Sequence, residues 1–237
     1  MRALHDVRHR GAWLLCVALA ACSRTEAPHA GDSAASVRVP LEVIESPGAL
    51  ATRREAQESF DNARDAVARK DFEGAATALS DAATFFQREA RDAQPDMKQA
   101  LDGTSEELDS LAVRAAHGEL RTVDALDHVF ARAHAAEASL HLLRAHAATI
   151  KRDKVRAGEE LVMSVDHLER AMKDGRLQSD SAIQAAIADT RSLAGEMVQG
   201  MEAVPDEMAR VTDEIEMAIR RICVCTLRIA PPPTVTR

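Results

Sequence analysis

Histidine is the residue type in this sequence with the most evident capacity for chemistry. Six histidines lie in one central stretch: His117, His128, His134, His141, His146 and His167. On a helix, residues seven apart share a face, so His134 and His141 lie on one side of it. Within this stretch no two histidines are four apart, the spacing at which one helix binds a metal ion, and no Glu-x-x-His occurs. Glu137 and His141 are four apart, which permits a hydrogen bond or half of a carboxylate–imidazole site.

Two interpretations of these histidines remain open. We expect imidazoles that face solvent or lie at the boundary of an Arg- and Ala-rich helix, with no bound cofactor. The alternative is a metal or haem site that uses His134 and His141 together with the closely spaced pair Cys223 and Cys225. A Cys-x-Cys pair binds a soft metal such as Cu(I) or closes a strained disulfide. No second cysteine pair completes a four-ligand site in the body of the chain.

Other kinds of chemistry find little support in the sequence. The chain of 237 residues carries a formal net charge of −8 and only 3% aromatic residues, which argues against nucleic-acid binding. No pattern of a phosphate-binding loop, a zinc protease or a serine hydrolase is present. Carboxylate pairs such as Glu106-Glu107 and Glu159-Glu160 are expected to be solvated, so none is expected to have the raised pKa that acid–base catalysis needs. The sequence therefore predicts a protein that is not an enzyme.

The N-terminal residues have the pattern of a bacterial export signal. Three arginines in the first ten residues precede an apolar stretch, residues 11–21, that is too short to span a bilayer. The stretch ends in Leu19-Ala20-Ala21-Cys22, which resembles the lipobox of bacterial lipoproteins. The resemblance implies cleavage of a signal peptide, residues 1–21, and attachment of acyl chains to Cys22. An ordinary secretory signal is the alternative.

The lipobox resemblance also implies a location for the mature protein. Ser23 follows the cysteine, and by resemblance to the enterobacterial sorting rule this residue favours the outer membrane. Acyl chains on Cys22 would then hold the protein to the lipid bilayer at the periplasmic face. Residues 22–46, with their prolines and small residues, are expected to form a flexible tether.

The body of the chain is predicted to be all-α. Gly and Pro are scarce, with 10 and 8 residues, and Pro95 and Pro205 are the only prolines between Gly48 and Ala230. Apolar residues recur at spacings of three and four in seven successive segments, and no segment alternates as a strand does. We expect an antiparallel helical bundle of about seven helices over residues 47–224, followed by a proline-rich tail, residues 225–237.

An internal repeat is predicted within this bundle. A shift of 82 residues aligns 53–92 with 135–174 and matches Asp71 with Asp153 and Leu79 with Leu161. We interpret it as a duplicated three-helix unit, with turns at both aspartates and a seventh helix closing the second copy. Residues 70–82 also resemble the central turn of a tetratricopeptide hairpin, although the Trp-Leu-Gly start of that repeat is missing.

The sequence as a whole predicts a membrane-anchored lipoprotein that acts by binding. Its expected role is that of a scaffold or accessory protein of the cell envelope, with a protein partner there and no nucleic acid. The alternative is a periplasmic helical bundle that binds metal or haem through His134, His141 and Cys223/Cys225.

Overall fold

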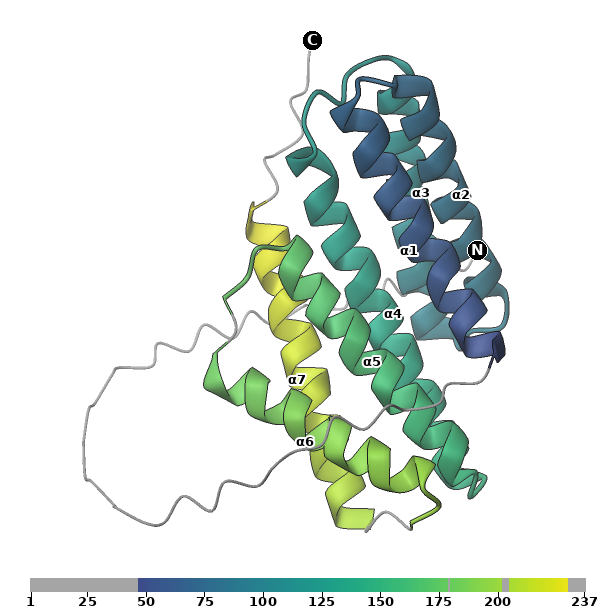
Figure 1. Cartoon of the computed structure of the whole chain (residues 1–237), viewed down its shortest axis with the longest axis vertical. Coiled ribbons are helices and arrows are strands. Elements are labelled where there is room, and N and C mark those ends of the chain that lie inside the picture. The colour runs from purple at the N-terminus through teal and green to yellow at the C-terminus, as the bar shows by residue number, and fades with distance from the viewer. Residues whose placement is uncertain (1–46, 179, 202–204, 230–237) are drawn as a thin grey trace, which may run out of the picture. The chain divides into compact units, whose positions relative to one another are not determined.

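Seven α-helices make up the part of the chain that the computed structural model describes, residues 47–178, 180–201 and 205–229, in which no strand occurs (Figure 1). Side chains are described for residues 55–178, 180–201 and 205–223. The helices are α1 (Pro47–Ala68), α2 (Phe72–Arg91), α3 (Pro95–Ala116), α4 (Asp124–Ile150), α5 (Lys154–Asp174), α6 (Ser181–Val198) and α7 (Pro205–Ile229). The predicted all-α class is confirmed.

The structure tests the predicted boundary at the C-terminal end of the bundle but not the boundaries at the N-terminal end. The segments expected to form the signal peptide and the tether, and the expected lipidation site Cys22, lie outside the described residues. At the other end, α7 continues to Ile229, so the expected start of the tail at residue 225 is wrong. The helix continues to this residue because residues 225–229 contain neither glycine nor proline.

Proline and aspartate determine where most of the helices begin. α1, α3 and α7 each have proline as their first residue, where the missing N–H costs no hydrogen bond. Asp71, Asp153 and Asp180 precede α2, α5 and α6, and each side chain accepts a hydrogen bond from a backbone N–H of the first turn. These starts depend on local sequence alone.

The predicted turns at Asp71 and Asp153 are confirmed, and they have the same local geometry. Lys70 and Arg152, the residues before the two aspartates, have φ values of 59° and 58°. The backbone N–H of Asp71 donates to Ala66 at 2.8 Å, and that of Asp153 donates to Ala148 at 3.0 Å. Two turns 82 residues apart therefore use the same left-handed residue and the same N-cap.

The 82-residue offset extends further than the sequence comparison indicated. α3 ends at Ala116 and α6 at Val198, and the glycines that follow, Gly118 and Gly200, have φ values of 70° and 85°. α4 and α7 begin 81 residues apart. α4 is thus both the last helix of one copy and the first helix of the next.

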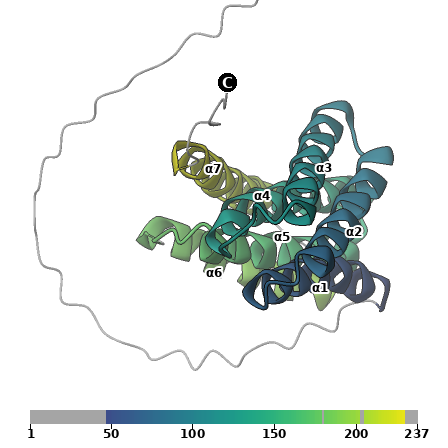
Figure 2. The same cartoon turned by 90° about the horizontal axis from the view of Figure 1, so that it is seen from above.

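The interior consists of two hydrophobic cores that share α4. The first core contains residues of α1, α2, α3 and mainly the N-terminal half of α4, including Phe60, Phe86 and Phe130. The second contains residues from the C-terminal half of α4 and from α5, α6 and α7. We call these groups of helices the first and second halves. Both views show α4 and α5 between α1–α3 on one side and α6 and α7 on the other (Figures 1 and 2).

No helix among the described residues combines the length and the apolar character needed to cross a membrane.

Candidate functional site

A cluster of buried polar side chains lies in the middle of α4 and α5, where the two cores adjoin. His134 and Glu137 are three residues apart on α4 and therefore share a face, and His167 faces them from α5. The three side chains, which we call the His–Glu–His cluster, are only 1%, 2% and 1% exposed. Buried polar groups of this kind are costly unless they satisfy one another or hold an ion.

The geometry of the His–Glu–His cluster fits a metal ion. The Nδ1 atoms of His134 and His167 lie 3.1 and 3.0 Å from Oε2 of Glu137 and 3.2 Å from each other. In a tetrahedral site with metal–ligand distances of about 2.0–2.1 Å, two ligand atoms are about 3.3 Å apart. Among the described residues this is the only group of three or more such side chains with ligand atoms this close together.

The expected protonation states of the cluster also favour a cation. Burial lowers the pKa of His167, although Glu137 opposes this shift. Burial would raise the pKa of Glu137, but the adjoining His167 and the hydrogen bonds with His134 and His167 outweigh it, and the pKa lies well below its usual range. An ionised carboxylate beside a neutral imidazole is the state that metal ligands must adopt.

The surroundings of His134 resemble the outer shell of a metal site. Its Nε2 atom lies 3.6 Å from Oδ2 of Asp174, and Oδ1 of Asp174 lies 2.8 Å from the Arg64 guanidinium of α1. Phe60 meets the His134 ring edge-on, with centroids 5.1 Å apart. With a metal ion on Nδ1, the imidazole would carry its proton on Nε2, on the side of the Asp174 carboxylate. The buried Nε2 atom of His134 and Oδ2 atom of Asp174 are not hydrogen-bonded among the described residues.

A second imidazole–carboxylate pair adjoins the cluster. Nδ1 of His141 lies 2.6 Å from Oε2 of Glu160, and Arg156 contacts the other oxygen of Glu160 at 2.5 Å. The His141 ring stacks on that of His167, with centroids 5.3 Å apart and planes at 12°. Burial lowers the pKa of His141 despite Glu160. Burial would raise the pKa of Glu160, but the hydrogen bond with His141 and the arginine charges lower it.

The expectation that the histidines face solvent is wrong for three of them. His134, His141 and His167 are buried, and so are Glu159 and Glu160, which were expected to be solvated. The expectation assumed that each helix buries one face only. α4 instead contributes to both cores, and its buried residues cover more than one face. A polar residue of α4 that points away from one core therefore lies against the other core or against α5.

The structure does not bring the whole alternative ligand set together. That set consists of His134, His141, Cys223 and Cys225. His134 belongs to the His–Glu–His cluster, whereas His141 pairs with Glu160 beside it. Cys223 is half-buried on α7, outside this cluster, and burial raises the pKa of its thiol. The side chain of Cys225 lies outside the described residues.

Two members of the cluster, Glu137 and His167, were not predicted as its ligands. A signal for the first was present, because His134 and Glu137 form a His-x-x-Glu whose side chains share a helix face. His167 is 33 residues from His134, and no local pattern connects the two.

Two imidazole nitrogens and one carboxylate oxygen form a donor set that is used by both zinc and non-haem iron sites. Such a donor set could hold a first-row transition-metal ion such as Zn²⁺ or Fe²⁺. No family model, curated protein or solved structure matches this chain.

Proposed function

We propose that this chain is a helical-bundle protein of the bacterial cell envelope that binds one divalent first-row transition-metal ion, Zn²⁺ or Fe²⁺. His134, Glu137 and His167 are the proposed ligands. The observation that supports the proposal most strongly is the mutual approach of their three ligand atoms, at 3.0, 3.1 and 3.2 Å. All three atoms lie in the core, where burial without a partner is costly.

A metal ion accounts for this arrangement better than hydrogen bonds alone. Both imidazoles can donate a hydrogen bond from Nδ1 to Oε2 of Glu137, but the two N–H donors then lie only 3.2 Å apart, and the ionised Glu137 still retains its negative charge in the core. A divalent cation accepts a lone pair from all three atoms and compensates that charge. The rings of His134 and His167 also lie only 5.4 Å apart, which favours a single ion over a haem between them.

The position of the ion suggests what it does for the protein. The ligands come from α4 and α5, and α1 packs on the same cluster through Phe60. Because the ligands are buried, binding would stabilise the contact between the two halves rather than present the metal to a substrate. We therefore infer a binding or scaffold role in which the metal stabilises the folded bundle.

The test is metal loading of the full chain, followed by elemental analysis and thermal unfolding. After incubation with Zn²⁺, or with Fe²⁺ without oxygen, and removal of excess metal, we expect one ion per chain and a midpoint raised by several degrees. His167→Ala and Glu137→Gln should abolish both effects, and the exposed His117→Ala should retain them. Failure of both metals to bind, or binding retained by both cluster variants, would overturn the proposal.

We further propose that acyl chains on Cys22 anchor the protein at the periplasmic face of the outer membrane. The support is the lipobox-like Leu19-Ala20-Ala21-Cys22 and the serine that follows it. Cys22→Ser should prevent labelling with a palmitate analogue in bacterial cells and release the protein from the membrane fraction, or leave it unprocessed. Persistent labelling and membrane association of the variant would contradict the anchor.

A further inference from the structure

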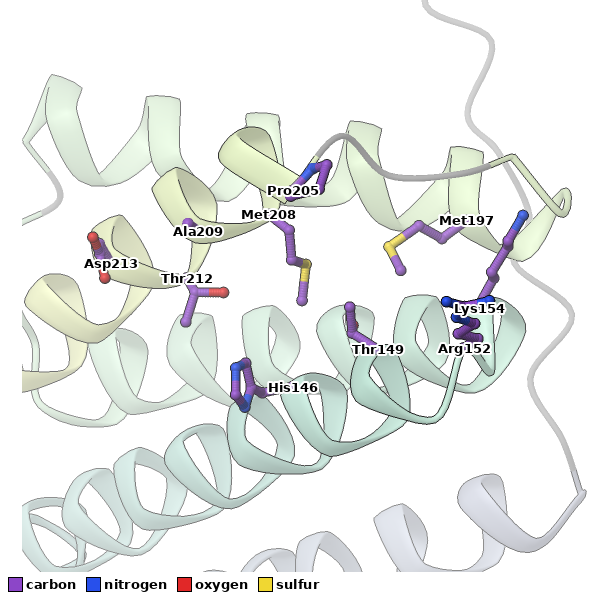
Figure 3. A pocket seen from close by; sticks show the side chains of 10 residues that line it. All are labelled: His146, Thr149, Arg152, Lys154, Met197, Pro205, Met208, Ala209, Thr212 and Asp213. Atoms are coloured by element: carbon purple, nitrogen blue, oxygen red, sulfur yellow. The ribbon is translucent and has the colours of Figure 1, made fainter.

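A cavity of about 460 Å³ opens in the second half, between the C-terminal end of α4, the end of α6 and the start of α7 (Figure 3). Cavities of this size are typical of sites for small organic ligands. Its wall includes Thr149, Arg152, Lys154, Met197, Met208 and Thr212. The cavity is separate from the His–Glu–His cluster, none of whose three residues lines it.

The 82-residue offset shows what fills the equivalent place in the first half. Thr212 corresponds to Phe130, and His146, which also lines the cavity, corresponds to Arg64. The Phe130 ring is fully buried, stacks on Phe60 with centroids 4.3 Å apart, and lies 4.7 Å below the Arg64 guanidinium. An aromatic ring beneath a cation thus occupies this position in the first half.

The second half has no counterpart of the Phe130 ring, and it also lacks a counterpart of the Phe72 ring. Lys154 corresponds to Phe72, so a second aromatic side chain of the first half is replaced by a cation. Thr212, in the place of Phe130, leaves its Oγ1 atom buried with no hydrogen-bond partner among the described residues. A buried hydroxyl without a partner is costly unless a ligand or water bonds to it. Threonine in the place of the buried Phe130 ring leaves less side-chain volume at this position, as a cavity requires.

The charges around the cavity are unequally distributed. Arg152 and Lys154 lie together at one end, and Asp213 lies at the opposite end (Figure 3). Met197 and Met208 direct their thioethers into the space between these ends, and sulfur makes favourable contacts with aromatic rings. The cavity therefore offers a cationic end, a soft apolar middle and one unpartnered hydroxyl.

We propose that this cavity binds a small aromatic carboxylate. The ring would take the place that Phe130 occupies in the first half and lie against Met197 and Met208. The carboxylate would lie toward Arg152 and Lys154, and the Thr212 hydroxyl would hydrogen-bond to a polar atom of the ligand. This site and the proposed metal site are independent of each other.

The test uses 2-naphthoate as the probe and the methionine methyl groups as reporters. In the full chain labelled with ¹³C-methyl methionine, we expect saturable NMR shifts of the Met197 and Met208 signals at millimolar probe or below. The Met97 signal, from the first half, should not move. Arg152→Gln should weaken the binding of 2-naphthoate several-fold and leave that of neutral 2-naphthol unchanged. Equal effects of this variant on both probes would exclude the carboxylate assignment.

Filling the cavity provides the decisive variant. Thr212→Phe restores the side chain that the first half carries, and we expect it to abolish binding of 2-naphthoate while the helical circular-dichroism spectrum is retained. Thr77→Phe, the same change at an exposed position of α2, is the matched control and should bind as the original chain does. Thr212→Ala, which removes only the hydroxyl and one methyl group, should keep the cavity open and bind more weakly. Absence of saturable shifts in the original chain, or undiminished binding by a folded Thr212→Phe variant, would overturn the proposal.

Discussion

At the scale of single residues, burial decides what the histidines of this protein can do. His117 is exposed at the end of α3, whereas His134 is buried against Phe60 and contacts both Glu137 and His167. The two are chemically identical side chains. Only His134 lies in the core, where a ring nitrogen without a partner is costly. A metal ion bound there would compensate for the water that this nitrogen loses on burial.

Replacing His134 should therefore destabilise the metal-free protein far more than replacing His117. We expect His134→Ala to lower the free energy of unfolding by about 2 kcal/mol or more, since it leaves a cavity and removes a partner of the buried Glu137. His117→Ala should cost less than about 0.5 kcal/mol. Urea unfolding followed by circular dichroism measures both values. Equal costs would show that the cluster contributes nothing to stability.

The buried pairs also predict how stability depends on pH. The pKa values of His141 and His167 are lowered from 6.5, and those of Glu137 and Glu160 from 4.5. As the pH falls below 6.5, the unfolded chain takes up protons on the two histidines that the folded chain resists, so stability falls. Below 4.5 the two glutamates add a further loss in the same direction.

Urea midpoints of the metal-free chain should therefore decrease steadily from pH 7.5 to pH 5.5. His141→Gln should make this decrease smaller, and His117→Gln, the exposed control, should leave it unchanged. A midpoint that rises toward pH 5.5 would contradict the lowered histidine pKa values.

At the scale of elements, the contact between α5 and α6 depends on the absence of one side chain. A Cβ atom at Gly158 would lie 2.7 Å from the backbone oxygen of Ala194 and 2.8 Å from Cγ2 of Val198. The two helices are therefore too close for any residue but glycine at this position. At Gly103, on α3, nothing lies within 4 Å of the equivalent point except its chain neighbours and the backbone of its own helix.

The same substitution at these two glycines should have opposite effects. Gly158→Ala should lower the free energy of unfolding by about 1–3 kcal/mol, because α6 must move away from α5. Gly103→Ala should raise it by about 0.5–1 kcal/mol, since alanine restricts the unfolded chain and favours the helix. Chemical denaturation of both variants measures these two changes in the free energy of unfolding. A stabilising Gly158→Ala would mean that α5 and α6 are further apart.

At the scale of the whole bundle, α4 makes the two halves interdependent. Its buried residues belong to both cores, and Arg64 of α1 reaches Asp127 of α4 and Asp174 of α5, at 3.4 and 2.8 Å. Neither half has a complete core without α4. We therefore expect the two halves to unfold together.

A substitution in one core should accordingly expose the other. Phe130→Ala, in the first core, should cost about 3–5 kcal/mol and increase hydrogen exchange in α5 and α7 as well as in α2. Ile187→Ala, in the second core, should likewise increase exchange in α2. Hydrogen-exchange mass spectrometry measures all three helices. Unchanged protection of α5 and α7 in Phe130→Ala would show two independent domains.

The helices and their ends could be predicted from the sequence because their causes are local. Apolar spacing, proline at the first helical position and aspartate at the N-cap act within a few residues. The repeated turns at Asp71 and Asp153 were predictable for the same reason, and so was the all-α class. The exception, the end of α7, was misjudged because no helix breaker precedes Pro231.

The candidate sites were decided by tertiary structure. Sequence patterns gave no sign that α4 is covered by two cores, and this coverage is what buries His134 and Glu137 and brings His167 to them across 33 residues. The cavity in the second half likewise lies where Thr212 takes the place of the buried Phe130 of the first half. Both sites depend on which side chains meet across helices, and that is determined by long-range packing rather than by local sequence.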